Sequence, residues 1–138
     1  MADCLFCSII AGSIPSAKVY ESEKLYAFLD LNPANKGHTL LVPRNHCQDI
    51  LTVDPALGKE FLEAIQRITP AILAVTGATG FNVTQNNGKS AGQEIFHLHW
   101  HIIPRFAGDG LKLWQQHTYD SQEEMNRLAT AIKVQIGL

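Results

Sequence analysis

The sequence predicts an α+β fold in which an antiparallel sheet of five strands packs against one long helix, with another helix near the C-terminus. Three observations predict it. The β-prone runs come in two paired groups, an apolar stripe at helical spacing separates these groups, and 138 residues suit one domain with one core. We therefore expect a single domain, 1–138, and not a repeated β-α-β unit.

The N-terminal part combines a short helix with three strands. Residues 4–11 carry apolar side chains at helical spacing, and Gly12 and Pro15 end the helix. Residues 17–21 and 25–30 are β-prone runs separated by Ser22-Glu23, which predicts a hairpin. The turn-rich residues 32–37 then lead into a strand predicted at 38–43.

The long helix begins at Asp54-Pro55, a capping acid followed by a proline whose missing N–H costs nothing at that position. We expect it to reach about Val75, to kink at Pro70 and to end at Gly77. Its stripe recurs every three or four residues: Leu57, Phe61, Ile65, Ile68 and Ile72.

The C-terminal part contains two more strands and a helix. Strands are predicted at 80–85 and 95–104, joined by the glycine-bearing segment 86–92. Ser121 and Glu124 form a capping box for a helix whose apolar residues are Met125, Leu128, Ile132 and Ile136.

Composition excludes several classes of function. A net charge of −2 gives the protein no overall positive electrostatic field to attract a polyanion, so we expect no nucleic-acid partner. The N-terminus has neither a basic segment nor a long apolar run, so we expect no signal peptide, no membrane span and a cytoplasmic location. Three cysteines are too few and odd in number for a disulfide framework.

Three histidines alternate with apolar residues in the predicted strand 95–104. His97, His99 and His101 would share one face, with rings roughly 6.5–7 Å apart, while Leu98, Trp100 and Ile102 enter the core. Such rings can bracket a small group such as a phosphate. A metal site is the alternative, because imidazole is the commonest metal ligand.

Other candidates remain ambiguous from the residues alone. Gly88-Lys89-Ser90 resembles the end of a P-loop, but Val83 stands where that motif needs glycine. Cys4-x-x-Cys7 fits a redox couple, two buried thiols, or half a zinc site completed by His46 and a strand histidine.

The roles of two residues near the turn 32–37, His38 and Asp30, also remain open. His38 can donate to a phosphate or sugar, or cap its strand. Asp30 can accept from ribose hydroxyls or be a solvated turn acid. Trp114 lies in an exposed context and can meet a partner or a base, whereas alternation places Trp100 in the core.

The segment His97-Leu98-His99-Trp100-His101-Ile102-Ile103 resembles the His-x-His-x-His-x-x signature of the histidine triad family of nucleotide hydrolases and transferases. The resemblance extends, in order, over residues 4–10, 27–30, 37–43 and 86–105. It implies the family's α+β fold with a five-stranded antiparallel sheet, and a homodimer formed through the long helix and a central strand.

The resemblance also implies roles for individual residues. His99 would attack the α-phosphorus to give a nucleotidyl-histidine, His101 would bind phosphate oxygens and assist proton delivery, and His38 would order the site. Nucleotide contacts would come from Phe6, Ile9, Phe28, Asp30, Leu31, Asn86, Gly92, Gln93 and Glu94, besides His99 and His101. Glu94 departs from the Ser or Thr often found there, and its carboxylate would repel a bound anion.

Some bacterial-type members are similar in holding zinc on a Cys-x-x-Cys pair and two histidines. By position, the ligands would be Cys4, Cys7, His46 and His97. Four protein ligands would make this zinc structural, and no organic cofactor is expected.

The resemblance favours a hydrolase that releases a nucleoside monophosphate from purine nucleoside phosphoramidates or related conjugates. The alternatives are a dinucleoside polyphosphate hydrolase, a nucleotide-binding interaction module with incidental activity, and a metal-binding structural protein.

Overall fold

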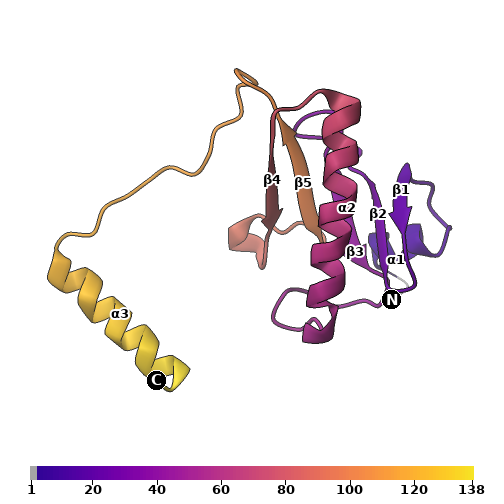
Figure 1. Ribbon diagram of the computed structural model, residues 1–138. Helices are drawn as coiled ribbons and strands as arrows, with labels where there is room; N and C mark the ends of the chain where they lie inside the picture. Colours follow the sequence, from indigo (N-terminus) through magenta and orange to yellow (C-terminus); the bar gives the residue numbers. More distant parts are fainter. Residues whose placement is uncertain (1–2) are drawn as a thin grey trace.

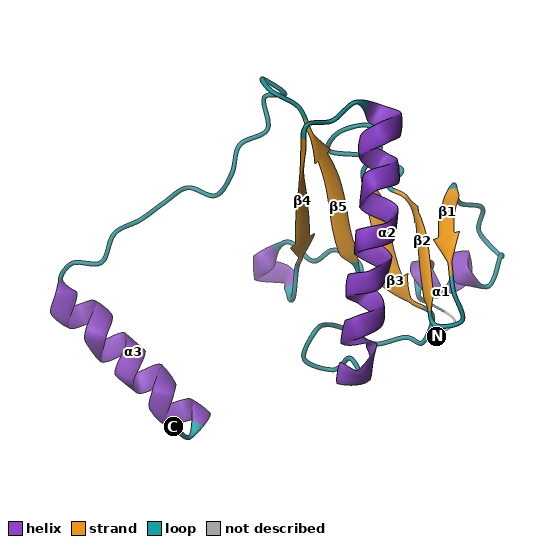
Figure 2. Ribbon diagram, in the orientation of Figure 1, coloured by secondary structure: helices purple, strands orange, loops and turns teal. Residues whose placement is uncertain are grey.

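A single antiparallel sheet organises the chain, with one helix on each of its faces (Figures 1 and 2). The structure, a computed structural model, describes residues 3–138. The strand order is β1-β2-β3-β5-β4, and every neighbouring pair is antiparallel. The predicted α+β class and the five-stranded sheet are confirmed.

Four strands lie where the sequence predicts them. They are β1 (Lys18–Glu21), β2 (Leu25–Leu29), β3 (Thr39–Pro43) and β4 (Gly80–Gln85). The predicted hairpin is formed by β1 and β2. The fifth strand, β5 (Trp100–Arg105), pairs with both β3 and β4 and therefore lies inside the sheet.

The expected start of the fifth strand at residue 95 is wrong, because β5 begins at Trp100. Before that point the chain bonds to a loop: the Leu98 N–H donates to the Cys47 carbonyl over 2.8 Å. His97 and His99 therefore precede the strand, and only His101 lies within it. The three histidines do not form one row on a strand.

The long helix matches its prediction closely. A 3₁₀ turn (Pro55–Leu57) leads into α2 (Gly58–Thr76), and the Asp54 carboxylate accepts from the Ala56 N–H over 2.9 Å. Gly77 ends α2 in the left-handed conformation, at φ 77°. The helix continues through Pro70, whose ring lies on the exposed side.

The main core lies between α2 and the sheet. Leu98 and Ile102 are fully buried there, as the alternation predicts. Trp100 is half-buried, with its ring 6.0 Å from that of Phe61. The buried members of this core are Leu25, Ala27, Leu41, Phe61, Ala64, Ile68, Leu98 and Ile102.

A second apolar cluster covers the opposite face of the sheet, where α1 (Leu5–Ile10) packs. Phe6 and Ile9 of α1 are buried against residues of β2 and β3 (Tyr26, Phe28, Leu40 and Val42). The Phe6 ring also meets the rings of His97 and His99 edge-on, at centroid distances of 5.9 and 5.1 Å. The N-terminal helix is thus packed directly against the histidines.

The last helix, α3 (Gln122–Ile136), stands apart from the sheet at the end of a long loop (Figure 1). Its predicted cap is present, since the Ser121 hydroxyl accepts from the Glu124 N–H over 3.0 Å. The apolar residues predicted along it are exposed. Among residues 3–138, no helix combines the length and apolar character needed to cross a membrane.

Candidate active site and metal centre

A cavity of about 810 Å³ opens on the α1 face of the sheet. It is lined by all the predicted nucleotide-binding residues except Asn86 and Gln93: Phe6, Ile9, Phe28, Asp30, Leu31, Gly92, Glu94, His99 and His101. One part of the wall is apolar and another carries carboxylates and imidazoles. This division suits a ligand with a planar apolar end and a polar end.

His99 lines this cavity, and a hydrogen bond defines which of its two ring nitrogens carries the proton. Its Nδ1 lies 2.7 Å from the main-chain carbonyl oxygen of His97, and only a protonated nitrogen can donate to a carbonyl. Neutral His99 therefore carries its proton on Nδ1 and a lone pair on Nε2. Among residues 3–138 none hydrogen-bonds to that Nε2, so His99, which lines the cavity, keeps a lone pair that can act as a nucleophile.

His101 and His38 form a second ordered unit. The Ala34 N–H donates to Nδ1 of His38 over 3.0 Å, so neutral His38 carries its proton on Nε2. Nε2 of His38 lies 2.9 Å from Nδ1 of His101 and donates to it. His101 is thereby left with its own proton on Nε2. The chain Ala34, His38, His101 thus ends in an N–H donor at the site.

Electrostatics keep these rings neutral near pH 7. Burial lowers the pKa of His99, opposed by its bond to the His97 carbonyl and by Asp30. Burial, with Asp30 opposing and His99 assisting, also lowers the pKa of His38. The pKa of His101 falls to about 4 through burial and its two histidine neighbours. The ring centroids of His99 and His101 are 4.9 Å apart, closer than their spacing along a strand predicts.

The loop between β4 and β5 is held together by Gln93, which is buried. Its Oε1 accepts from the Gly88 N–H over 2.8 Å, and its Nε2 donates to the carbonyls of Gln48 and Ile95 over 2.8 and 3.1 Å. Its polar atoms are engaged by main-chain groups of this loop and of the loop after β3, and it lines neither cavity beside the histidines. Gln93 therefore orders this loop.

A smaller cavity of about 380 Å³ adjoins the first and shares His101 with it. Asn86 lies here, with His38. Glu94 is exposed at the wall of the larger cavity, where solvent screens its carboxylate.

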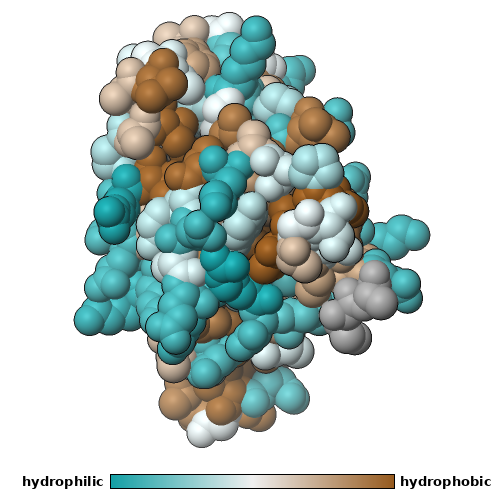
Figure 3. All heavy atoms as spheres, turned by 90° about the vertical axis from the view of Figure 1, so that its right-hand side faces the viewer, coloured by the Kyte–Doolittle hydropathy of each residue, from teal (hydrophilic) through white to brown (hydrophobic). Residues whose placement is uncertain are grey.

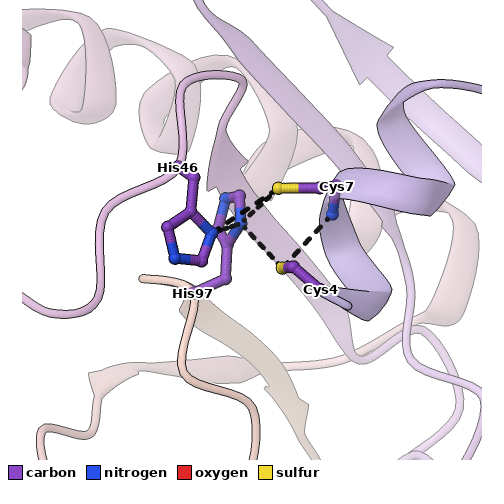
Figure 4. A group of neighbouring side chains, drawn as sticks. All are labelled: Cys4, Cys7, His46 and His97. Carbon is purple, nitrogen blue, oxygen red and sulfur yellow. Dashed lines mark hydrogen bonds between the residues drawn. The ribbon is translucent and has the colours of Figure 1, made fainter. Parts of the chain in front are cut away.

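Two further histidines, His46 and His97, form a separate cluster with two cysteines (Figure 4). Cys4 and Cys7 come from the start of α1, His46 from the loop after β3, and His97 from the segment before β5. Cys4 Sγ lies 3.4 Å from Nδ1 of His97, and Cys7 Sγ lies 3.5 Å from Nδ1 of both His46 and His97. The two Nδ1 atoms are 3.2 Å apart.

These distances are those of a tetrahedron around zinc. With Zn–S near 2.3 Å and Zn–N near 2.0–2.1 Å, ideal tetrahedral edges are about 3.3 Å for N···N and about 3.6 Å for S···N. His97 also has the support of a metal ligand, since its Nε2 donates to the Pro43 carbonyl over 2.8 Å and leaves a lone pair on Nδ1. The donor set and its geometry are consistent with zinc.

Asp30, His38 and His101 also lie close enough to be considered as metal ligands. Here, however, the two facing ring nitrogens already share a hydrogen bond, and the Ala34 N–H occupies the remaining nitrogen of His38. A cation bound to Nε2 of His38 would displace the proton on that nitrogen, which is the only ring N–H of neutral His38 and is donated to His101. This group is a hydrogen-bonded chain and not a second metal site.

Comparison with known proteins assigns the family. The family model described as the HIT domain matches residues 11–108. The chain belongs to the HIT family. It is 43% identical to Protein hit of Bacillus subtilis over 133 residues, which cover 94% of this chain and 92% of that relative.

Solved structures of similar proteins share the fold. A crystal structure from Streptococcus mutans UA159 has a TM-score of 0.91 and 42% identity, covering 99% of this chain and 87% of that one. A structure from Mycobacterium smegmatis, described as a Zn-bound histidine triad family protein, has a TM-score of 0.76 and 34% identity, covering 99% and 96%.

Two relatives of this HIT chain are named for their activities. One is an adenosine 5'-monophosphoramidase of Candida albicans, 36% identical over 75% of this chain and 71% of the relative. The other is an adenylylsulfatase of Arabidopsis thaliana, 36% identical over 95% of this chain and 68% of the relative.

The sequence analysis missed several residues of the candidate site. Ala34 acts through its main-chain N–H, for which side-chain chemistry gives no signal. Lys36 lines the larger cavity as a cation, and its place just before Gly37-His38 is a signal that was available. Segment 14–17 also forms part of the wall, although its residues have no functional pattern.

Proposed function

We propose that this protein is a nucleotide hydrolase that releases a nucleoside monophosphate from purine nucleoside phosphoramidates or closely related conjugates. The observation that carries the proposal is the protonation of the His99 ring, which places the proton on Nδ1 and the lone pair on Nε2. The bond from its Nδ1 to the His97 carbonyl leaves a nucleophilic Nε2 beside the 810 Å³ cavity. The activities of the two named relatives support the same class of substrate.

The nucleoside would occupy the larger cavity. Its base would pack among apolar side chains of α1 and β2, chiefly Phe6, Ile9 and Phe28, and the ribose hydroxyls would donate to the Asp30 carboxylate. Asp30 is set for this role, because its Oδ1 accepts from the Asn32 N–H over 2.9 Å. The α-phosphate would then lie between His99 and His101.

The first chemical step forms a bond from Nε2 of His99 to phosphorus and breaks the bond from phosphorus to the leaving nitrogen. The leaving nitrogen keeps the electron pair and takes a proton from solvent. The charge of the resulting imidazolium is stabilised because its Nδ1–H bonds to the His97 carbonyl. One displacement is thereby divided into two easier steps.

In the second step, the oxygen of a water molecule bonds to phosphorus and the bond to Nε2 breaks. The electron pair of that bond returns to His99, and the water's proton goes to solvent. His101 remains neutral throughout, because its pKa is lowered to about 4, and its Nε2–H donates to phosphate oxygens. His38 would orient it, and Asn86, which lines the smaller cavity together with His101, would face the leaving group.

Trapping the covalent nucleotidyl adduct tests this function. Wild-type protein is quenched in acid-free denaturant during turnover of adenosine 5'-phosphoramidate, digested, and analysed by mass spectrometry. We expect an adenylyl mass on the peptide containing His99, and its absence in His99→Ala with a loss of turnover on the order of 10⁴-fold or more. His117→Ala, in the exposed loop before α3, is the matched control and retains activity. Wild-type turnover by His99→Ala would disprove the assigned nucleophile.

We propose that the resident metal is zinc, held by Cys4, Cys7, His46 and His97. With four protein ligands it would supply no reacting water and would instead fix these residues relative to one another. The Zn-bound relative from Mycobacterium smegmatis supports this assignment. Through His97, the metal would hold the carbonyl that orients His99.

We further propose a homodimer formed at the β4 edge and α2. β4 is an edge strand, and Phe81 and Val83 on it are 46% and 36% exposed. Leu62 of α2 is 57% exposed, and a second exposed apolar set lies along α3. Analytical ultracentrifugation tests the proposal: we expect a dimer in the wild type and a monomer in Phe81→Lys/Val83→Lys. A monomeric wild type would contradict it.

A further inference from the structure

Two cavities meet at His101, and they differ in which other histidine they touch. The larger one contains His99, whereas the smaller one contains His38 and Asn86. His101 lies in the wall of both. A phosphorus bound beside His99 and His101 therefore has the nucleoside cavity on one side and the smaller cavity on another.

The proposed reaction requires a place for the leaving group. Attacking and departing atoms lie roughly in line across phosphorus, so the departing atom lies away from Nε2 of His99. The smaller cavity borders His101 and not His99, and its volume of about 380 Å³ is enough for a small amine or acid. It is therefore the available site for the group that leaves.

The two cationic side chains that line this cavity, Arg105 and Lys112, differ in how far their charge is compensated by neighbouring groups. Arg105 is fully engaged: its guanidinium donates to the Asp109 carboxylate over 2.7 and 2.9 Å, and to Asn82 Oδ1 over 2.8 Å. This pairing holds the pKa of the Asp109 carboxyl well below its usual range. Arg105 thus offers little net charge to a ligand.

Lys112 differs from Arg105, because within residues 3–138 it makes no salt bridge and no side-chain hydrogen bond. The described lining of this cavity also includes no aspartate or glutamate. The positive charge of Lys112 is therefore uncompensated in this cavity, and the long flexible side chain of Lys112 can bring that charge to an anion. The larger cavity, by contrast, has the carboxylates of Asp30 and Glu94 in its wall beside the cation Lys36.

The segment that carries Lys112 is anchored beside the site. Nη2 of Arg105 donates to the Leu111 carbonyl over 3.0 Å, and the Leu111 N–H donates to the Asp109 carboxylate over 3.0 Å. Trp114, 74% exposed, follows in the same wall and offers an aromatic face. A ligand here would meet a cation and an apolar surface together.

We propose that the smaller cavity is the leaving-group subsite and that Lys112 makes it select leaving groups with a negative charge, which rests on the function proposed above. The chemical class is an amine that carries a carboxylate a few bonds from the phosphoramidate nitrogen. When the P–N bond breaks, this amine departs with the electron pair and a solvent proton, and its carboxylate stays paired with Lys112.

Two matched substrates test the subsite: adenosine 5'-phosphoramidates of β-alanine and of β-alaninamide, which differ in charge and hardly in size. The measured quantity is the ratio of their kcat/KM values, followed by AMP release. We expect this ratio to fall about fivefold in Lys112→Gln, the scale of one exposed ion pair, and further in Lys112→Glu. Intrinsic differences between the two leaving amines cancel, because each variant is compared with wild type on the same pair.

Lys89→Gln is the matched control, since Lys89 is an exposed lysine of the neighbouring loop that lines neither cavity. Its ratio should equal that of wild type. In ~1 M salt, where charges are screened beyond about 3 Å, the wild-type ratio should approach that of Lys112→Gln. A ratio unchanged in both Lys112 variants overturns the subsite while leaving the hydrolase function intact. If wild type hydrolyses adenosine 5'-phosphoramidate but neither of these two compounds, the subsite is likewise overturned. Failure on all three compounds overturns the proposed function itself.

Discussion

Nδ1 of His99 donates over 2.7 Å to the carbonyl oxygen of His97, whose own Nδ1 lies among the sulfur and nitrogen atoms of the metal cluster. His97 therefore belongs to the proposed metal centre through its side chain and holds the proposed nucleophile, His99, through its main chain. Any displacement of His97 moves the acceptor that fixes the protonation of His99. The cluster is thus connected to His99 through a single residue.

Removing a cysteine ligand should remove the metal. We expect Cys4→Ser and Cys7→Ser to lose zinc and to lower the melting temperature and the free energy of unfolding, because metal binding and folding are coupled. Metal analysis of untagged protein and thermal denaturation measure both effects. Cys47→Ser is the control, since Cys47 lies outside the cluster, and it should keep one zinc per chain. Wild-type protein purified without zinc would contradict this prediction.

The tautomers of three histidines are fixed by their hydrogen bonds. We expect neutral His99 to be protonated on Nδ1, and both His38 and His101 on Nε2, because the acceptor and donor partners allow no other assignment. Long-range ¹H–¹⁵N correlation spectra at pH 7.5 distinguish the two forms of each ring. Finding His101 protonated on Nδ1 would break the chain from Ala34.

The free energy of unfolding should decrease as the pH falls from about 6.5 to about 4. The pKa of His101 is about 4 in the folded protein, through burial, His99 and His38, with Asp30 opposing. The unfolded chain therefore binds more protons in this range. His101 should account for about 1–2 kcal/mol after allowance for solvent screening.

Urea unfolding across this pH range measures the effect in wild type and in His101→Gln, whose amide can still accept from His38. The variant should show a shallower dependence on pH. His117→Gln, in the exposed loop, should match wild type. Equal slopes in His101→Gln and wild type would exclude His101 as the source.

Gly37→Ala should be much more destabilising than Gly12→Ala. Both glycines have positive φ, at 99° and 83°, but a Cβ at Gly37 would lie 2.8 Å from Cγ2 of Thr76, whereas Gly12 has open space around it. We expect about 1–3 kcal/mol for Gly37→Ala from the strained backbone, increased by the contact. Denaturant titration of both variants tests this, and equal costs would show that backbone conformation alone decides the effect.

The fold was predictable from the sequence because its elements have strong local signals. Asp54-Pro55 and Gly77 delimit α2, and Ser121 caps α3, all through local backbone geometry. The start of β5 was not predictable, because the alternation of apolar residues continues back through Leu98. β5 begins only at Trp100 because the Leu98 N–H donates to the carbonyl of Cys47, which is distant in the sequence, and not to a neighbouring strand.

The candidate site was predictable to a similar extent, but through the family resemblance. The resemblance identified residues whose side chains carry the chemistry, and most of them line one cavity. It also placed Gln93 among the nucleotide contacts, whereas the side-chain amide of Gln93 is hydrogen-bonded to main-chain groups of the loops after β3 and β4. Which polar group faces a ligand and which supports a loop depends on tertiary contacts that sequence spacing does not contain.

The hydrogen bond from Ala34 to His38 has a consequence for how this site can vary. The donor is a main-chain amide, which does not titrate and is present in every amino acid except proline. Replacing Ala34 by any residue except proline therefore keeps the donor that fixes the protonation of His38 and His101. This part of the candidate site depends on the path of the main chain, and a comparison of residue identities at position 34 would not reveal it.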